Sequence, residues 1–223
     1  MKKLILNFNS KDSRKIKNPK NFLGGKGANL SEMGRMGLPV PPGFTISTKV
    51  CEIFYKDKKK LNKNLISQIK KELKLIEKDV SKKFGDLKNP LLLSVRSGAR
   101  VSMPGMMDTI LNLGLNDKTV KALAIKTSNG RFAKDSYRRF IQMYGNVVMG
   151  VEGYHFEELI ENYKLTKGVL LDTDLDESDW DGLIEDFKRT VREKAKKDFP
   201  QDVYEQLLGA ISAVFLSWES NRA

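Results

Sequence analysis

The chain has 223 residues, 40% of them hydrophobic, which suits one large domain or one domain with a helical insertion. No apolar run approaches the roughly 18 residues that a membrane helix needs, so we expect no membrane partner. The single cysteine, Cys51, excludes an internal disulfide and fits the reducing cytoplasm, where we expect the protein to be found.

The net charge of +12 suggests nucleic-acid binding, but the distribution of charge argues against it. Residues 49–88 carry 13 lysines against 6 acids, whereas residues 151–186 carry 12 acids against 2 lysines. The lysines fall largely on one predicted helix and lack the interleaved aromatic residues that stack on bases. We therefore interpret them as a solvated helix face and expect no nucleic-acid partner. A polyanion-binding module and a helical interaction module without a ligand remain alternatives.

The first third of the chain alternates short apolar runs with amphipathic stretches. Strands are expected at 4–8 and 44–47, and a short helix at 49–55. From Leu61 to Phe84, apolar residues recur three or four apart and lysines occupy the other positions. This spacing predicts an amphipathic helix with a lysine-rich face.

A glycine-rich segment lies between these two strands, around Lys26. A helix is expected to begin near Gly27 and to end at 34–37. Glycines at a helix start expose N–H groups, the helix dipole favours anions there, and Lys26 adds a positive charge. The segment is not a Walker A loop, because no Ser or Thr follows the lysine. On its residues alone, it is interpreted slightly better as a flexible turn with an exposed lysine.

A second candidate anion site follows the apolar run 91–95, which predicts a buried strand. This strand is followed directly by Arg96, Ser97 and Gly98. Arginine offers a planar fork of donors that suits phosphate, and glycine lets backbone N–H groups approach a ligand closely. On residue chemistry alone, an ordinary strand exit with a solvated arginine is the stronger interpretation.

The rest of the chain, after about residue 116, is predicted to be mostly helical. Asn116 and Asp117 are candidate caps for the first, and apolar stripes predict helices at 131–144, 156–163 and 183–197. The acidic stretch 172–181 lacks the glycine and terminal glutamate of an EF-hand, so we expect a solvated loop that caps the next helix. Asp202 is expected to cap a last helix, whose apolar stripe runs to Trp218.

Two long and unusual runs carry a family resemblance. They are FLGGKGANLSEMGRMGLPVPPGFTIST, from Phe22 to Thr48, and SVRSGARVSMPGMMDTILNLGLND, from Ser94 to Asp117. Both resemble the pyruvate, phosphate dikinase family, and YGNVVMGV at 144–151 adds weaker similarity. The resemblance implies an α+β fold, the first part of an ATP-grasp-like nucleotide-binding domain. We expect an α/β subdomain at 1–111, a mostly helical inserted subdomain at 112–200, and a helix at 201–223 that returns to the first subdomain.

The family converts ATP, phosphate and pyruvate to AMP, pyrophosphate and phosphoenolpyruvate through a phosphohistidine. By resemblance, Lys26 and Arg96 are the best candidates to bind the phosphates of ATP, and the loop around Pro104 is expected to cover them. The further site residues implied are Ser102, Met103, Gly105 and Thr109, with Arg100 a second-rank candidate. Phosphoenolpyruvate synthase shares this type of domain and is the alternative, but the run PGMMDTILNLGL favours the dikinase.

The resemblance covers only the start of a longer protein. The magnesium ligands, the adenine pocket and the acceptor histidine are therefore expected beyond Ala223, in the remaining domains. The motif of the acceptor histidine is absent around His155, so we interpret His155 as a surface or packing residue. The segment thus has no catalytic or metal-ligating residue of its own, and we expect it to be inactive alone. The full-length enzyme uses pyruvate and phosphate, and a homodimer is one assembly that the resemblance allows.

Overall fold

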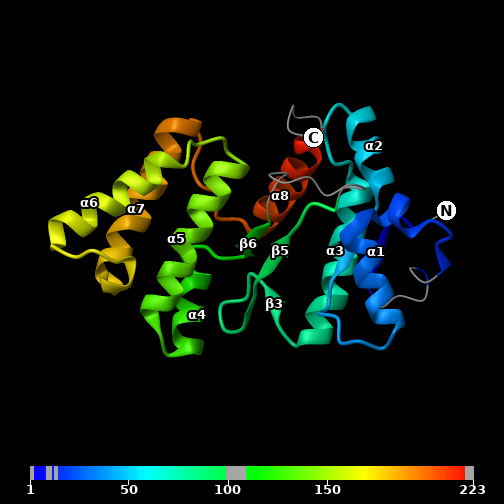
Figure 1. Cartoon of the computed structure of the whole chain (residues 1–223), viewed down its shortest axis with the longest axis horizontal. Coiled ribbons are helices and arrows are strands. Elements are labelled where there is room, and N and C mark those ends of the chain that lie inside the picture. Colours follow the sequence, from blue (N-terminus) through cyan, green and yellow to red (C-terminus); the bar gives the residue numbers. More distant parts are fainter. Residues whose placement is uncertain (1–2, 9–11, 13–14, 99–108, 219–223) are drawn as a thin grey trace. The chain divides into compact units, whose positions relative to one another are not determined.

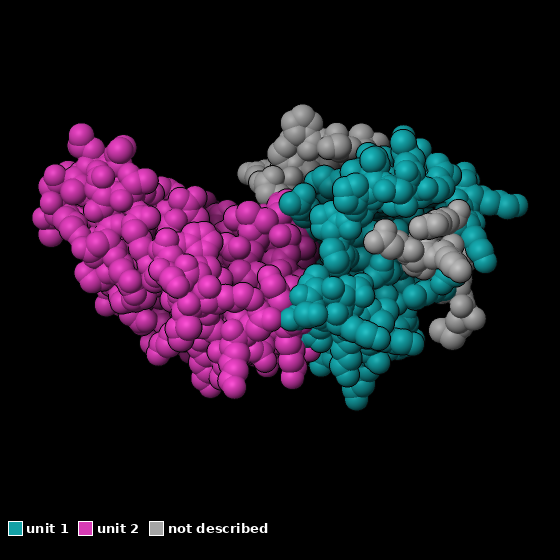
Figure 2. Space-filling view, turned by 90° about the horizontal axis from the view of Figure 1, so that it is seen from below, with its two compact units in different colours: residues 1–81, 96–108, 211–223 teal, residues 82–95, 109–210 magenta. Residues whose placement is uncertain are grey.

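The computed structural model describes residues 3–8, 12, 15–98 and 109–218 of the chain. The chain divides into two compact units, coloured teal and magenta in Figure 2. Unit 1 comprises residues 1–81, 96–108 and 211–223, and unit 2 comprises residues 82–95 and 109–210. Each unit has its own core and is described by itself.

Among its described residues, unit 1 contains a two-stranded antiparallel sheet, three whole helices and the end of a fourth. Strand β1 (Ile5–Asn7) pairs with β2 (Phe44–Ile46), so both strands predicted from the apolar runs are confirmed. Helix α3 contacts β1, whereas α1 contacts β2 and α2 (Figure 1). The helices bury one apolar face each, which removes that surface from water and stabilises the unit. They are α1 (Pro19–Arg35), α2 (Thr48–Lys56) and α3 (Lys63–Val80).

Helix α3 confirms the amphipathic pattern but ends before the pattern does. Leu65, Ile69 and Leu73 are buried along one face, as their spacing predicts. The helix stops at Val80 because Ser81 adopts a left-handed conformation, with φ of 52°. Phe84, expected to be the last helical residue, lies instead in strand β3 (Lys83–Phe84) of unit 2. The prediction of one helix through Phe84 was therefore wrong, because the apolar spacing happened to continue past the helix end.

Helix α1 starts earlier than predicted. The sequence indicated a helix from about Gly27, but the structure begins it at Pro19 and breaks it at Gly24. Proline is suited to the first helical turn, because its φ is already helical and it has no N–H group to leave unpaired. The prediction was therefore correct only for the part of the helix after the break.

Unit 2 contains two further small sheets. Strand β3 lies parallel to β4 (Pro90–Leu91), and β5 (Leu93–Val95) lies antiparallel to β6 (Ile110–Leu113). The run 91–95 was expected to form one buried strand, but it forms parts of two. Ser94 is exposed and its neighbours in β5 are half-buried, so β5 is not a buried strand. In the described residues β5 pairs with β6 alone, and its side chains are therefore more exposed to solvent than its apolar composition suggested.

The helices of unit 2 make up most of its core. Helix α5 contacts α4, α7 and β6, and α6 contacts α7 (Figure 1). Asn116 accepts hydrogen bonds from the backbone N–H groups of Lys118 and Thr119 at the start of α4, which confirms it as a cap. The helices are α4 (Thr119–Thr127), α5 (Gly130–Val147), α6 (Tyr154–Lys167) and α7 (Glu177–Ala195).

The last helix, α8 (Val203–Ser217), has its first residues in unit 2 and its last residues in unit 1. Asp202 accepts hydrogen bonds from the N–H groups of Tyr204 and Glu205, so the predicted cap is confirmed. Within unit 2, the buried Gln206 accepts from the N–H of Gly114 at 3.0 Å and donates to the carbonyl of Leu115 at 2.9 Å. These bonds fix the start of α8 beside the end of β6.

The described residues thus form a mixed α+β fold with three two-stranded sheets. The predicted division at 111 and 200 stays a prediction. Among the helices that the structure describes, none combines the length and the apolar character needed to cross a membrane.

Candidate phosphate-binding site

The two cationic residues predicted to bind phosphate, Lys26 and Arg96, both belong to unit 1 and are both exposed. Lys26 lies on α1 just after the break, and Arg96 directly follows β5. Thr109 is half-buried immediately before β6 and belongs to unit 2. The other candidates lie outside the described residues: Arg100, Ser102, Met103 and Gly105.

The break at Gly24 is the local feature that joins the two glycine-containing segments. Gly24 is buried, with φ of 73° and ψ of 173°, a conformation that side chains disfavour. A Cβ atom on Gly24 would overlap the carbonyl oxygen of Gly98 and lie 2.6 Å from its carbonyl carbon. The backbone after Arg96 therefore lies directly against the backbone before Lys26. The sequence analysis named both segments as candidate anion sites, and the tertiary structure brings their backbones into contact.

The residues around the break are held firmly on the sheet of unit 1. Phe22 and Leu23 are buried with Leu6 of β1. After the break, a Cβ atom on Gly27 would lie 2.8 Å from the Thr45 side chain of β2, so only glycine allows this close approach. Before it, the Thr48 hydroxyl donates a hydrogen bond of 2.7 Å to the carbonyl of Asn21. Both sides of the break are thus fixed to the rigid part of the unit.

The electrostatics of this region suit an anion. The helix resumes after Gly24, so Lys26 lies in the first turn of the resumed helix, where the helix dipole favours negative charge. Within the part of the chain that the structure describes, neither Lys26 nor Arg96 forms an ion pair. Among the described residues, therefore, no acidic partner would have to be displaced before these two exposed cations could meet an anion.

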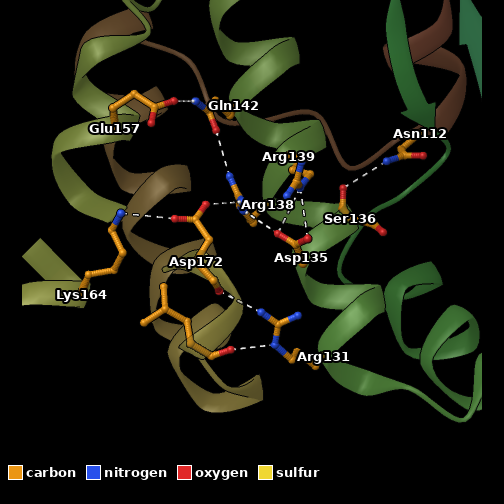
Figure 3. Close-up of polar contacts among 11 residues, drawn as sticks. Asn112, Arg131, Asp135, Ser136, Arg138, Arg139, Gln142, Glu157, Lys164 and Asp172 are labelled. Carbon is orange, nitrogen blue, oxygen red and sulfur yellow. Dashed lines mark hydrogen bonds and ion pairs between the residues drawn. The ribbon is translucent and has the colours of Figure 1, made fainter. Parts of the chain in front are cut away.

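Unit 2 contains a second group of cationic side chains, shown in Figure 3, in a different environment. Arg138 of α5 is only 4% exposed. It donates hydrogen bonds to Asp135 at 2.8 Å and to Asp172 at 3.2 Å, and it stacks on Trp180 with 4.6 Å to the ring centre. Arg131 donates to the carbonyl oxygens of Asp172 and Leu175. These arginines are satisfied by the protein itself, and they hold the acidic loop onto α5.

Asp176 of the acidic stretch caps a helix, as predicted, but the predicted loop 172–181 was too long, because residues 177–181 already belong to α7. The Asp176 carboxylate accepts hydrogen bonds from the N–H groups of Ser178 and Asp179 at the start of α7. Its hydrogen bond with the Lys167 side chain, together with that from Ser178, lowers the pKa of Asp176 well below the usual aspartate value. In the described residues no three potential ligands among His, Cys, Asp and Glu gather to hold a metal ion.

His155 is half-buried, and its ring lies 4.0 Å from the ring of Tyr154.

Burial raises the pKa of Tyr137 and of Tyr144, both of which belong to the core of unit 2. Burial is the largest cause of both shifts, so they reflect packing. The cations of unit 1 remain the candidate functional group.

Comparison with known proteins matches this chain to the family described as "Pyruvate phosphate dikinase, AMP/ATP-binding domain", over residues 20–71 and 59–223. A pyruvate, phosphate dikinase of Clostridium symbiosum is 53% identical over 205 residues, covering 92% of this chain and 24% of the relative. A chloroplastic pyruvate, phosphate dikinase of Flaveria pringlei is 52% identical over 222 residues, covering 100% of this chain and 23% of the relative.

A pyruvate, phosphate dikinase of Rhizobium meliloti is 48% identical over 223 residues, covering 100% of this chain and 25% of the relative. The chain thus spans about a quarter of the length of the curated relatives that it matches. The two runs quoted from the sequence fall inside the matched ranges. This chain belongs to the pyruvate phosphate dikinase AMP/ATP-binding domain family.

Proposed function

We propose that this chain forms part of the ATP site of a pyruvate, phosphate dikinase, and that Lys26 and Arg96 bind the phosphates of ATP. The observation that carries the proposal is the contact between Gly24 and Gly98, since it places the backbones of the two cationic segments together in unit 1. The family's description as an AMP/ATP-binding domain names the same ligand.

The chemistry of phosphoryl transfer explains why these residue types suit the task. Charge spreads over the peripheral oxygens of the transferring group, so catalysis depends mainly on positioning and on fixed positive charge. The Arg96 guanidinium offers paired N–H donors to two oxygens, whereas the Lys26 ammonium acts as a compact point charge. Ser102, Met103 and Gly105 are proposed to cover the phosphates, with Thr109 and Arg100 in supporting positions.

The wider architecture is also a proposal. The chain is the first part of an ATP-grasp-like domain, with an α/β subdomain at 1–111, a helical insertion at 112–200 and a returning helix at 201–223. The whole enzyme converts ATP, phosphate and pyruvate to AMP, pyrophosphate and phosphoenolpyruvate through a phosphohistidine on another domain. It acts as a cytoplasmic protein, although the Flaveria pringlei relative is named chloroplastic. A homodimer is proposed for the full-length protein.

Magnesium is proposed to accompany ATP, held by carboxylates outside this segment. No step of the proposal depends on metal bound to this chain. The chain's own contribution is to bind and orient phosphate oxygens.

An ATP titration followed by amide NMR signals tests the proposal. We expect Lys26→Ala and Arg96→Ala each to weaken binding by about tenfold or more, the scale of a lost charge-assisted hydrogen bond. Lys71→Ala is the matched control, because Lys71 is equally exposed in unit 1 but lies on α3. It should leave ATP binding unchanged.

A second candidate function rests on a hollow of about 500 Å³ along α3. It would make the chain a polyanion-binding module without ATP selectivity. In that case Lys71→Ala should weaken ATP and polyphosphate binding alike, and Lys26→Ala should have no effect. That outcome would refute the dikinase site proposed here. The lining residues are Lys63, Ile66, Ser67, Lys70, Lys71 and Lys74.

A further inference from the structure

We propose that Ser97 and Trp218 form a positioning pair for the phosphate site, in which the Trp218 indole holds the backbone that carries Arg96. The inference rests on the proposed function, because it concerns how the same site is kept in shape. It assigns a role to two uncharged residues that would act through Arg96.

The first contact of the pair is a side-chain hydrogen bond. The indole Nε1–H of Trp218 donates to the hydroxyl oxygen of Ser97 over 3.1 Å. Ser97 is only 5% exposed, so its hydroxyl has little access to water and depends on a protein partner. Since Ser97 lies between Arg96 and Gly98, this bond holds the middle of the segment that leaves β5.

The segment that carries Arg96 has a second contact, at Gly98, on the other side of Ser97. The Gly98 backbone rests against Gly24, where no side chain could fit. The three residues from Arg96 to Gly98 are thus held both by the Trp218 ring and by the break in α1. Only the Arg96 side chain extends from this segment into solvent. Fixing its backbone reduces the conformational freedom that phosphate binding would otherwise have to remove.

Trp218 is itself held by an aromatic group at the end of α8. Its ring packs edge-on against Phe215 at 6.4 Å, and Phe215 contacts Phe54 of α2 at 5.3 Å. The Tyr55 hydroxyl donates a hydrogen bond of 2.8 Å to the carbonyl of Phe215. The pair therefore connects the Arg96 segment to the packed helices of unit 1, and the bond between Tyr55 and Phe215 offers a matched control.

The experiment is the same ATP titration, applied to Ser97→Ala and Trp218→Phe, with thermal melting measured for each variant. Each change removes one member of the hydrogen bond and keeps most of the packing. We expect roughly three- to tenfold weaker ATP binding from either variant, the scale of one hydrogen bond. The double variant should bind no more weakly than the single ones, because both remove the same interaction.

Tyr55→Phe separates positioning from general stability. It removes a hydrogen bond of similar length to the same end of α8 but leaves Ser97 and Trp218 in contact. It should lower the melting temperature without changing ATP affinity. Equal weakening by Tyr55→Phe would show that any loosening of α8 acts on the site, and the inference would be wrong.

A measurement on the unaltered chain keeps the test independent of folding defects in the variants. The indole N–H signal of Trp218 should shift on addition of ATP, whereas that of Trp180, fully buried in unit 2, should not. ATP binding that depends on Lys26 and Arg96 but ignores Ser97 and Trp218 would overturn the inference alone. No dependence on Lys26 and Arg96 would overturn the proposed function, and the inference with it.

Discussion

The two units both contain conspicuous cationic side chains, but those of unit 2 are paired within the protein and those of unit 1 are exposed to solvent. In unit 2, Arg138 is buried, stacked on Trp180 and bonded to two aspartates. In unit 1, Lys26 and Arg96 are exposed, and within the described residues they lack ion-pair partners. A buried cation needs a partner inside the protein, because removing its charge from water costs free energy. An exposed cation stays hydrated and is free to bind a ligand. The comparison distinguishes Arg138, which stabilises the fold, from Lys26 and Arg96, which are candidates for ligand binding.

The largest expected effect concerns the backbone contact in unit 1. Gly24→Ala should destabilise unit 1 by about 3 kcal/mol or more, because it adds a strained φ to a clash with the Gly98 backbone. Gly37→Ala is the control, since Gly37 has a similar φ of 78° but nothing within 4 Å of an added Cβ. It should cost only about 1 kcal/mol. Urea denaturation monitored through the amide signals of unit 1 compares the two, and equal losses would contradict the close approach.

The next effect concerns the paired arginine of unit 2. Arg138→Ala should destabilise that unit by about 2–3 kcal/mol, because charged hydrogen bonds and the stacking on Trp180 are lost together. ATP binding should be unaffected. Arg139→Ala is the control, because its ion pair with Asp135 is exposed and should contribute less than about 1 kcal/mol. Urea denaturation of unit 2 measures both, and an Arg138→Ala variant as stable as Arg139→Ala would remove the contrast between the units.

A smaller effect should depend on pH through the cap of α7. The pKa of Asp176 is lowered in the folded chain by the Lys167 and Ser178 hydrogen bonds. A lowered folded pKa means that the carboxylate stabilises the fold above the pKa of the unfolded chain, and that this contribution disappears as pH falls through the folded value. The stability difference between the wild-type chain and Asp176→Asn should therefore stay constant near neutral pH and shrink only as the pH falls below the ordinary aspartate pKa of 3.8. Glu193→Gln, an exposed change on the same helix, should show no such trend in denaturation at several pH values.

The smallest expected effect is in enzymatic turnover, which we expect to be undetectable for this chain alone. We propose that the phosphoryl acceptor lies outside this segment, and we interpret His155, whose ring lies 4.0 Å from that of Tyr154, as a packing residue. The purified chain incubated with ATP, magnesium, phosphate and pyruvate should produce no AMP or phosphoenolpyruvate above background. Turnover that disappears in Lys26→Ala would mean that the segment is catalytically complete, contrary to our proposal.

Local sequence patterns predicted the elements whose hydrogen bonds repeat along the chain. The stripe from Leu65 to Ile76 gave the face of α3, and Asp202 marked the start of α8. Such features depend on residues within one or two helical turns, so spacing alone reveals them. The family-specific runs likewise identified Lys26 and Arg96 as site candidates.

What the sequence by itself determined is therefore the family, most helices and the types of cation available for phosphate. The tertiary structure alone decided which cations are paired and which segments meet. Nothing local indicated that Gly24 would break α1 against Gly98, that Arg138 would be buried on Trp180, or that Trp218 would hold Ser97. The physical reason is that these contacts join residues far apart in the chain, and their formation depends on how whole elements pack rather than on any repeating local pattern.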